Sequence, residues 1–251
     1  MNNSKYNGIT EGVIWKQLML FFFPVLLGTF FQQLYNTVDA VIVGRFVGKE
    51  ALAAVGGSSS QILNLLIGFF TGVASGAAVI VAQYYGARDA EDSSRSVHTA
   101  MILAIASGAL MTVIGILTAP ALLRIMATPE DTMADSIVYM RWVYLAMIPG
   151  MVYNMGSAIL RAVGDSKHPL YFLIACCLIN VALDLLFVVT FKMGVAGAAV
   201  ATALSQLLSA VMICLFLARP KTEESVRLEL SKLRTDWKLM RRTIHIGLPS
   251  G

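Results

Sequence analysis

The sequence predicts an all-α membrane protein whose main part is a bundle of six transmembrane helices. Hydrophobic residues make up 57% of the 251-residue chain and charged residues only 14%, whereas soluble domains carry roughly 25% charged residues. A helix needs about 20 apolar residues to cross the hydrocarbon core of a bilayer. Six runs have about this length: Leu18–Val43, Ile62–Tyr84, Ala100–Leu123, Ile137–Ile159, Leu170–Phe191 and Val195–Leu217. A soluble protein with buried helices would need charged helix faces, which these runs lack.

The distribution of lysine and arginine predicts the orientation of the bundle. Positively charged residues gather in cytoplasmic loops. If the N-terminus is cytoplasmic, the inner segments hold most of these residues, including a dense group from Arg219 to Arg242. The outer loops then hold only Arg45, Lys49, Arg124 and Lys192, with Arg141 near the outer end of the fourth run. We therefore expect a multi-pass protein of the cytoplasmic membrane with both ends of this chain in the cytoplasm.

A weak internal repeat predicts a second copy of the six-helix unit. The stretch "TEGVIWKQLMLFFFP" (Thr10–Pro24) aligns with "TDWKLMRRTIHIGLP" (Thr235–Pro249), and both are charged segments that open an apolar run with proline. Two copies in the same orientation are typical of one class of transporter. We expect a cytoplasmic N-terminus (1–15), a six-helix lobe (16–218), a charged cytoplasmic linker (219–243) and the start of a seventh helix (244–251). An amphipathic tail on the inner surface is the alternative for the last two segments.

Three ionisable residues lie inside the six runs. Arg141 starts the fourth run near the outer surface, where its side chain can reach water. Asp39 lies close to the outer end of its run and Asp184 lies deeper. A charged side chain at the centre of a bilayer costs about 2.5–3.5 kcal/mol on insertion scales. We therefore expect both aspartates to serve a function.

Polar stripes accompany the two aspartates at helical spacing. Gln32 and Asn36 precede Asp39, Asn180 lies one turn before Asp184, and the second and sixth runs carry further stripes. The neutral residues in question are Gln61, Asn64, Thr202, Ser205 and Ser209. Such stripes either line a wet cavity or join helices through hydrogen bonds, and the two aspartates favour a cavity.

A carboxylate in a partly dry cavity can hold a proton at neutral pH or bind a sodium ion together with amide and hydroxyl oxygens. Either occupant would allow an ion gradient to drive a conformational change. The chain contains no phosphate-binding loop of the G-x-x-x-x-G-K-[ST] type. It also has no recognisable nucleophile or metal motif, so we expect neither an enzyme nor a bound cofactor. The net charge of +4 comes from the loops, and we expect no nucleic-acid partner.

Several strings resemble the multidrug and toxic compound extrusion (MATE) transporters. They are "PVLLGTFFQQLYNTVDAVIVGRFVGKEALAAVG" (Pro24–Gly56), "LRAVGDSKHP" (Leu160–Pro169) and "NVALDLLFV…GVAGAAVATALSQ" (Asn180–Gln206). The resemblance implies twelve helices in two six-helix lobes, with this chain as the N-terminal lobe. It also implies export of small amphipathic, often cationic, organic compounds in exchange for H⁺ or Na⁺.

The resemblance further implies the residues of the ion site. Cation or proton coupling would fall on Asp39, Asn180, Asp184, Thr202 and Tyr139, of which all but Tyr139 would suit Na⁺. Pro24 matches the proline at which the first helix of such proteins bends. The second lobe expected on the same full-length chain is absent from this sequence, so the resemblance does not by itself imply transport by this chain alone.

The sequence thus predicts a secondary active multidrug efflux antiporter that works by alternating access. One alternative is a flippase for lipid-linked precursors of the same superfamily, which would want a cationic cavity. The other is a non-transporting half that acts as an assembly partner. We expect Gln32, Asn36, Gln61 and Asn64 to line the cavity or contact substrate, and the same oxygen atoms would serve H⁺ and Na⁺ equally.

Overall fold

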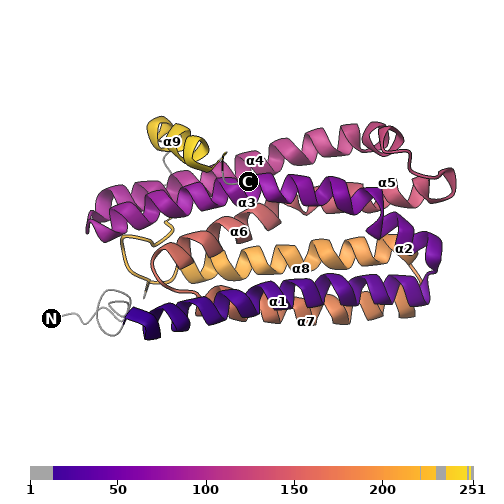
Figure 1. Cartoon of the computed structure of the whole chain (residues 1–251), viewed down its shortest axis with the longest axis horizontal. Helices are drawn as coiled ribbons and strands as arrows, with labels where there is room; N and C mark the ends of the chain where they lie inside the picture. The colour runs from indigo at the N-terminus through magenta and orange to yellow at the C-terminus, as the bar shows by residue number, and fades with distance from the viewer. Residues whose placement is uncertain (1–13, 221, 230–235, 248, 250–251) are drawn as a thin grey trace.

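The computed structural model describes residues 14–220, 222–229, 236–247 and 249 of the chain. These residues form helices joined by short connections, without β-strands (Figure 1). Most of the predicted N-terminal segment (1–15) and parts of the predicted linker and of the predicted seventh helix lie outside the described residues. The elements are α1 Ile14–Phe46, α2 Lys49–Gly56, α3 Ser58–Gly86, α4 Ala90–Ile125, α5 Glu130–Leu145, α6 Met147–Ala162, α7 Lys167–Asp184, the π-helix η1 Leu185–Thr190, α8 Gly194–Leu217 and α9 Trp237–Gly247.

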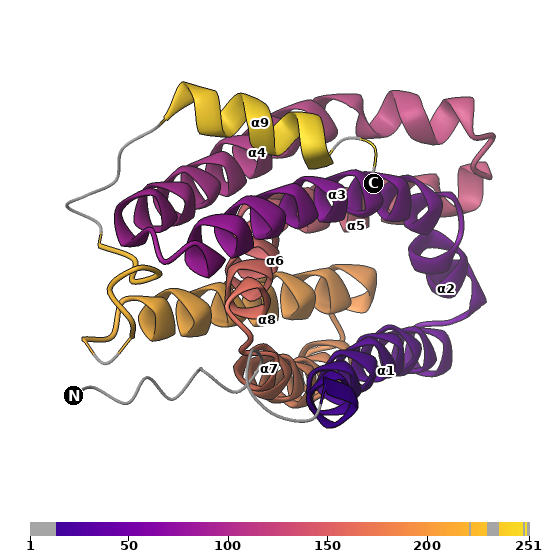
Figure 2. The same ribbon diagram turned by 60° about the vertical axis from the view of Figure 1, so that its left-hand side comes forward.

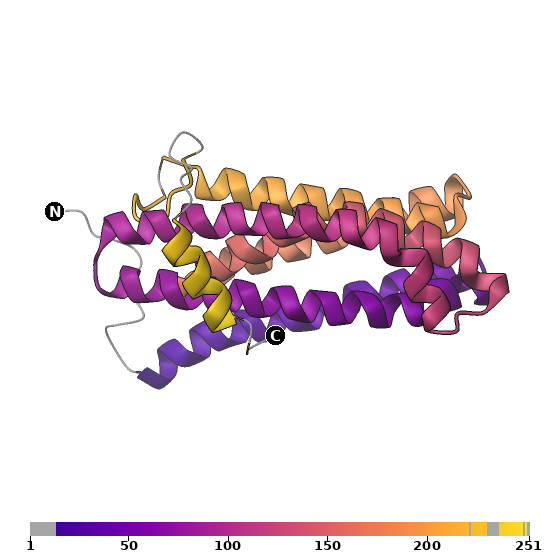
Figure 3. The same cartoon turned by 90° about the horizontal axis from the view of Figure 1, so that it is seen from above.

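The long helices run roughly along one axis and pack as a bundle (Figures 1 and 3). α1 packs on α7 and α7 packs on α8, while α6 packs on α3, α4 and α8. In Figure 2, α1 and α3 lie apart, and the short helix α2 joins them at one end. This topology places α1, α7 and α8 side by side, and these helices carry Asp39, Asp184 and Thr202.

The helices account for all six predicted apolar runs. Within the described residues, four segments are long and apolar enough to cross a membrane: Lys49–Gly86, Ala90–Ile125, Lys167–Thr190 and Gly194–Leu217. The bent pair α5–α6 makes a fifth. α1 is not among these five, but its 33 residues contain the run Leu18–Val43 and it runs along the bundle. The all-α membrane fold that the sequence predicts is therefore confirmed.

The fourth predicted run, Ile137–Ile159, is not one continuous helix. It breaks at Ala146 into α5 and α6, whose axes differ by 47°. Pro149 explains the break, because a proline has no N–H to donate and its ring clashes with the carbonyl group four residues earlier. That carbonyl belongs to Leu145, the last residue of α5. By contrast, α1 continues as a helix through its own proline, Pro24.

The fifth predicted run changes its helical form next to an aspartate. α7 ends at Asp184, and the six residues Leu185–Thr190 continue as a π-helix. The Phe191 N–H donates to the Leu186 carbonyl oxygen at 2.9 Å, five residues back. π-helical turns are rare and are frequent at functional sites, and nothing in the sequence predicts this one.

Small residues allow the helices to pack closely. A Cβ atom at Gly115 would lie 2.2 Å from the Tyr144 ring, and one at Gly156 would lie 2.8 Å from Ile213. Since lipid tails are as apolar as leucine, membrane helices associate through close packing and hydrogen bonds. The glycines on α4 and α6 therefore fix the approach of α5 and α8.

The segment after α8 lies against the bundle. His98 on α4 is buried, and its Nε2 lies 3.1 Å from both the nitrogen and the oxygen of the Glu229 backbone. The Asp236 N–H donates to Thr99 Oγ1 at 3.3 Å. α9 then begins at Trp237, inside the stretch predicted as a linker (219–243), and it packs on α3 and α4. The boundary predicted at residue 244 falls inside α9, in which Thr243 and Ile244 are consecutive residues of one helix.

Candidate functional site

Asp39 and Asp184 lie next to each other inside the bundle. Asp39 comes from the C-terminal third of α1 and is 6% exposed, whereas Asp184 ends α7 and is 0% exposed. Asp39 Oδ1 and both carboxyl oxygens of Asp184 are buried without a hydrogen-bond partner among the described residues. Buried polar atoms are almost always hydrogen-bonded in proteins, so this pair is ready to accept a proton or a cation.

Asn180 adds an amide to the same region of α7. It lies one helical turn before Asp184, which places both side chains on one face of the helix, and it is 0% exposed. Neither its oxygen nor its nitrogen has a hydrogen-bond partner in the part of the chain that the structure describes. The sequence predicted this pairing of amide and carboxyl, and the structure buries both of them completely.

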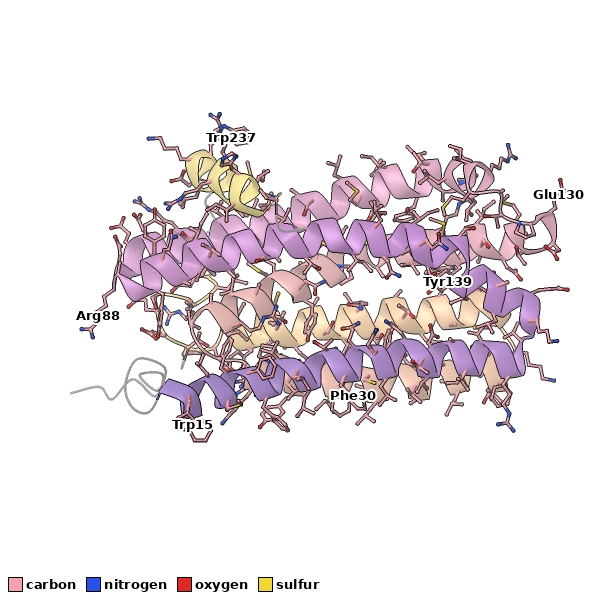
Figure 4. All side chains as sticks on the ribbon, in the orientation of Figure 1. Trp15, Phe30, Arg88, Glu130, Tyr139 and Trp237 are labelled. Carbon is pink, nitrogen blue, oxygen red and sulfur yellow. The ribbon has the colours of Figure 1, made fainter. Side chains whose placement is uncertain are left out.

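Two tyrosines complete the surroundings of the carboxyl groups. Tyr139 on α5 is buried and lies near both Asp39 and Asp184. Figure 4 labels it toward the end of the bundle that carries Glu130 and away from the end that carries Arg88. Tyr35 on α1 lies near Asp39, Asp184 and Tyr139. Tyr35 therefore joins the five site residues that the resemblance implies.

Tyr35 connects Thr202 to this cluster. Its hydroxyl group donates a hydrogen bond to Thr202 Oγ1 on α8 at 3.1 Å. The sequence-based set of site residues omitted Tyr35, although its position four residues before Asp39 places it on the same face of α1. The spacing of four residues from Asp39 could have identified Tyr35 in the sequence. It is easily overlooked because a tyrosine in an apolar helix is more often a packing residue.

The four predicted cavity-lining residues are more exposed than the two carboxyl groups. Gln32, Asn36, Gln61 and Asn64 are all exposed. The Asn36 amide donates to Gln33 Oε1 on its own helix at 3.4 Å. Gln32 does line a cavity, together with Pro24 and other residues around the middle of α1.

The donor set favours a proton or a hard monovalent cation. Its possible ligands are carboxyl, amide and hydroxyl oxygens, which suit hard cations. Within the described ranges, no group of three or more His, Cys, Asp and Glu side chains is arranged so that it could hold a metal ion of the kind that zinc and copper sites require. Two carboxyl groups in contact in a dry site cannot both stay ionised without compensation. One proton or one Na⁺ would supply that compensation.

Comparisons with known proteins agree with this architecture. The family model MatE matches residues 24–186. The chain belongs to the MATE family. It is 32% identical over 245 residues to the probable multidrug resistance protein YoeA of Bacillus subtilis (strain 168), an alignment that covers 94% of this chain and 52% of that protein. This chain thus spans about half the length of the curated MATE relatives that it matches.

Solved MATE structures share the fold as well. A structure described as the outward-facing conformation of a multidrug resistance MATE family transporter has a TM-score of 0.90, with 27% identity, 100% coverage of this chain and 55% coverage of that one. A structure described as the inward-facing conformation of such a transporter has a TM-score of 0.80, with 28% identity, 87% coverage of this chain and 49% of the other. These relatives are transporters rather than enzymes, and the chain corresponds to one lobe of their two-lobe fold.

Proposed function

We propose that this chain forms the N-terminal lobe of a secondary active efflux antiporter and that Asp39 and Asp184 together hold its coupling ion. The observation that carries the proposal is the contact of two buried carboxyl groups. Apart from each other, Asp39 Oδ1 and both oxygens of Asp184 have no hydrogen-bond partner among the described residues. Two buried carboxylates that lie side by side repel each other and lose the solvation that water would provide, so the state in which both are ionised is strongly unfavourable. An H⁺ or Na⁺ at this position removes that cost, and its loss restores it.

The surrounding residues suggest how occupancy would couple to a change of shape. Asp39 lies on α1, Asp184 and Asn180 on α7, Thr202 on α8 and Tyr139 on α5. An ion that bridges these helices would favour the packing in which they are close, and its release would favour another. An ion shifts such an equilibrium only by its difference in affinity for the two states. The same ion would compete with a cationic substrate for the carboxyl groups.

The cargo in this proposal is a small amphipathic organic compound, often cationic, that leaves the cell across the cytoplasmic membrane. Support comes from the multidrug resistance name of the Bacillus subtilis relative and from carboxyl groups that attract cations. The relatives are about twice as long as this chain, which supports a second six-helix lobe on the same full-length chain. The positive residues of Arg219–Arg242 support cytoplasmic termini for this lobe.

The decisive experiment replaces Asp184 by asparagine in the intact transporter. Asp184→Asn keeps the size of the side chain but removes the ionisable group. We expect coupled efflux of a cationic dye from cells to be abolished while the amount of folded protein in the membrane stays unchanged. The matched control is Asp135→Asn, because Asp135 is exposed on α5 and should not affect efflux. Unimpaired efflux by Asp184→Asn would overturn the proposal. Collapsing the proton gradient and the sodium gradient separately then identifies the coupling ion.

A further inference from the structure

The cavity lined by Pro24 and Gln32 lies between α1, α6 and the N-terminal half of α7, with a volume of about 380 Å³. α1 contributes Pro24 and Gln32 to its wall, and α7 contributes Leu170 and Leu173. α1 and α7 run in the same direction, because Gly28 faces Leu170 and Leu173 while Asp39 lies beside Asp184 further along. Gln32 precedes Asp39 by two turns, or about 10 Å at 1.5 Å per residue. The cavity is therefore separate from the carboxyl pair, although both lie on the same two helices.

The polar residues of this cavity come mainly from one face of α6. Asn154, Ser157 and Arg161 line it, and their spacing of three and four residues places them on one side of a helix. The guanidinium group of Arg161 makes no ion pair within the described residues. Arg161 is the one charged side chain in the described lining, and no carboxylate accompanies it. The cavity therefore has the opposite charge to the Asp39–Asp184 site.

Ser157 adds a buried hydroxyl group to the wall of the cavity. Its side chain is 2% exposed, and its hydroxyl group contacts that of Tyr153, one turn earlier on α6. The nearby hydroxyl of Tyr153 donates its proton to the Pro169 carbonyl oxygen at 3.0 Å. Because the Tyr153 proton is directed at Pro169, the Ser157 hydroxyl group can give its own proton either to the Tyr153 oxygen or to an acceptor oxygen of a ligand.

We propose that this cavity binds the anionic head of an amphipathic molecule, a phosphate monoester or diester or a carboxylate, with its apolar part against α1 and α7. Arg161 supplies the charge-assisted hydrogen bonds that phosphate and carboxylate groups prefer. Ser157 and the Asn154 amide supply neutral donors. Val25, Leu170 and Leu173 supply an apolar wall. Such a molecule can come from the lipid of the inner leaflet or from the cytosol as cargo.

The first arm of the test measures octyl phosphate binding to the purified full-length transporter in a neutral maltoside detergent by calorimetry. We expect saturable binding that weakens about tenfold in Arg161→Gln, since a charged hydrogen bond contributes on that order. Arg161→Lys should lose less, and Ser157→Ala should weaken binding even if Arg161→Gln fails to fold. The matched control Arg124→Gln changes an exposed arginine at the end of α4 and should have no effect. Octyl glucoside should not compete.

The second arm separates the two sources of the ligand. The transporter is placed in phosphatidylcholine nanodiscs doped with phosphatidylglycerol, and the retained lipids are weighed by native mass spectrometry. Enrichment of phosphatidylglycerol that Arg161→Gln removes identifies a lipid. Octyl phosphate binding without such enrichment identifies a soluble amphiphile. Absence of binding in both arms, or equal binding by wild type and Arg161→Gln, overturns the proposal. Asp184→Asn should bind octyl phosphate normally, so failure here is distinguishable from failure of the coupling site.

Discussion

The Tyr35 hydroxyl group on α1 donates a hydrogen bond to Thr202 Oγ1 on α8 at 3.1 Å. This bond joins two helices that lie far apart in the sequence, and it does so beside the Asp39–Asp184 pair. It therefore links the packing of α1 against α8 to the environment of the carboxyl groups. Hydrogen bonds between membrane helices contribute about 0.6 kcal/mol on average, so the link is weak enough to break during a conformational change.

Removing this hydroxyl group should loosen the link without emptying space in the core. We expect Tyr35→Phe to lower the free energy of unfolding by only about 0.6 kcal/mol. We expect the rate of coupled efflux to fall although most of the protein remains folded. Thermal melting in detergent and dye efflux measure the two effects. Tyr171→Phe is the control, because Tyr171 is exposed on α7. Equal behaviour of the two variants would show that the Tyr35–Thr202 bond has no role.

The contact between the two carboxyl groups should appear as an energetic coupling. In alkaline buffer without Na⁺, both groups are forced toward ionisation and repel each other. We expect Asp39→Asn and Asp184→Asn each to raise the melting temperature under these conditions, because either change removes the repulsion. The double variant should gain less than the sum, with a coupling of at least about 0.5 kcal/mol, as for residues in contact. Strictly additive gains would mean that the two groups do not interact.

His98 should hold the segment after α8 against α4. Its Nδ1 lies 2.7 Å from the Ser94 carbonyl oxygen, so Nδ1 carries the proton and Nε2 accepts the Glu229 N–H at 3.1 Å. We expect His98→Ala to speed hydrogen exchange of the peptide that contains residues 226–229 by about fivefold, because a lost bond of this kind is worth about 1 kcal/mol. His245→Gln, at an exposed position of α9, serves as the control. Unchanged exchange in His98→Ala would show that His98 does not hold this segment against α4.

The crossing of α3 and α9 should depend on a glycine. A Cβ atom at Gly76 would lie 2.4 Å from the Thr243 carbonyl oxygen and 2.7 Å from the Gly247 nitrogen. Because these are backbone atoms that cannot move aside cheaply, we expect Gly76→Ala to displace α9. Labelling of Leu239→Cys, a buried position on α9, measures the displacement after Cys176, Cys177 and Cys214 have been replaced by alanine.

Gly86→Ala on the same helix is the matched control for this experiment, because a Cβ atom there meets nothing within 4 Å. Maleimide labelling at position 239 should rise several-fold in Gly76→Ala and stay at its starting level in Gly86→Ala. If both variants label at the same rate, α9 does not require the close approach at Gly76.

The sequence alone determined where the helices lie and which residues are costly to bury. Six apolar runs are a local property of composition, and the bilayer requires each of them to be helical because its interior offers no other hydrogen-bond partners for the backbone. The same reasoning identified Asp39 and Asp184, since an ionisable residue in such a run is costly. The resemblance, and not the pattern, supplied Tyr139.

Pro149 could have predicted the break at Ala146. The sequence stays apolar on both sides of this proline, so hydrophobicity alone indicates one continuous helix. The start of α9 at Trp237 is not apparent from hydrophobicity either, because the charged residues on its exposed face are typical of a linker. Hydrophobicity alone marks neither boundary: the first depends on the backbone chemistry of proline and the second on the amphipathic pattern of α9.

Only the tertiary structure decided which residues meet. The contact of Asp39 with Asp184, the bond from Tyr35 to Thr202 and the contact of His98 with Glu229 each join different elements. They depend on how each helix is rotated about its axis and on how closely glycines let the helices approach. The cavity that holds Arg161 has the same origin, since its walls come from three helices. Rotation and approach are settled by packing between helices, which no local stretch of sequence encodes.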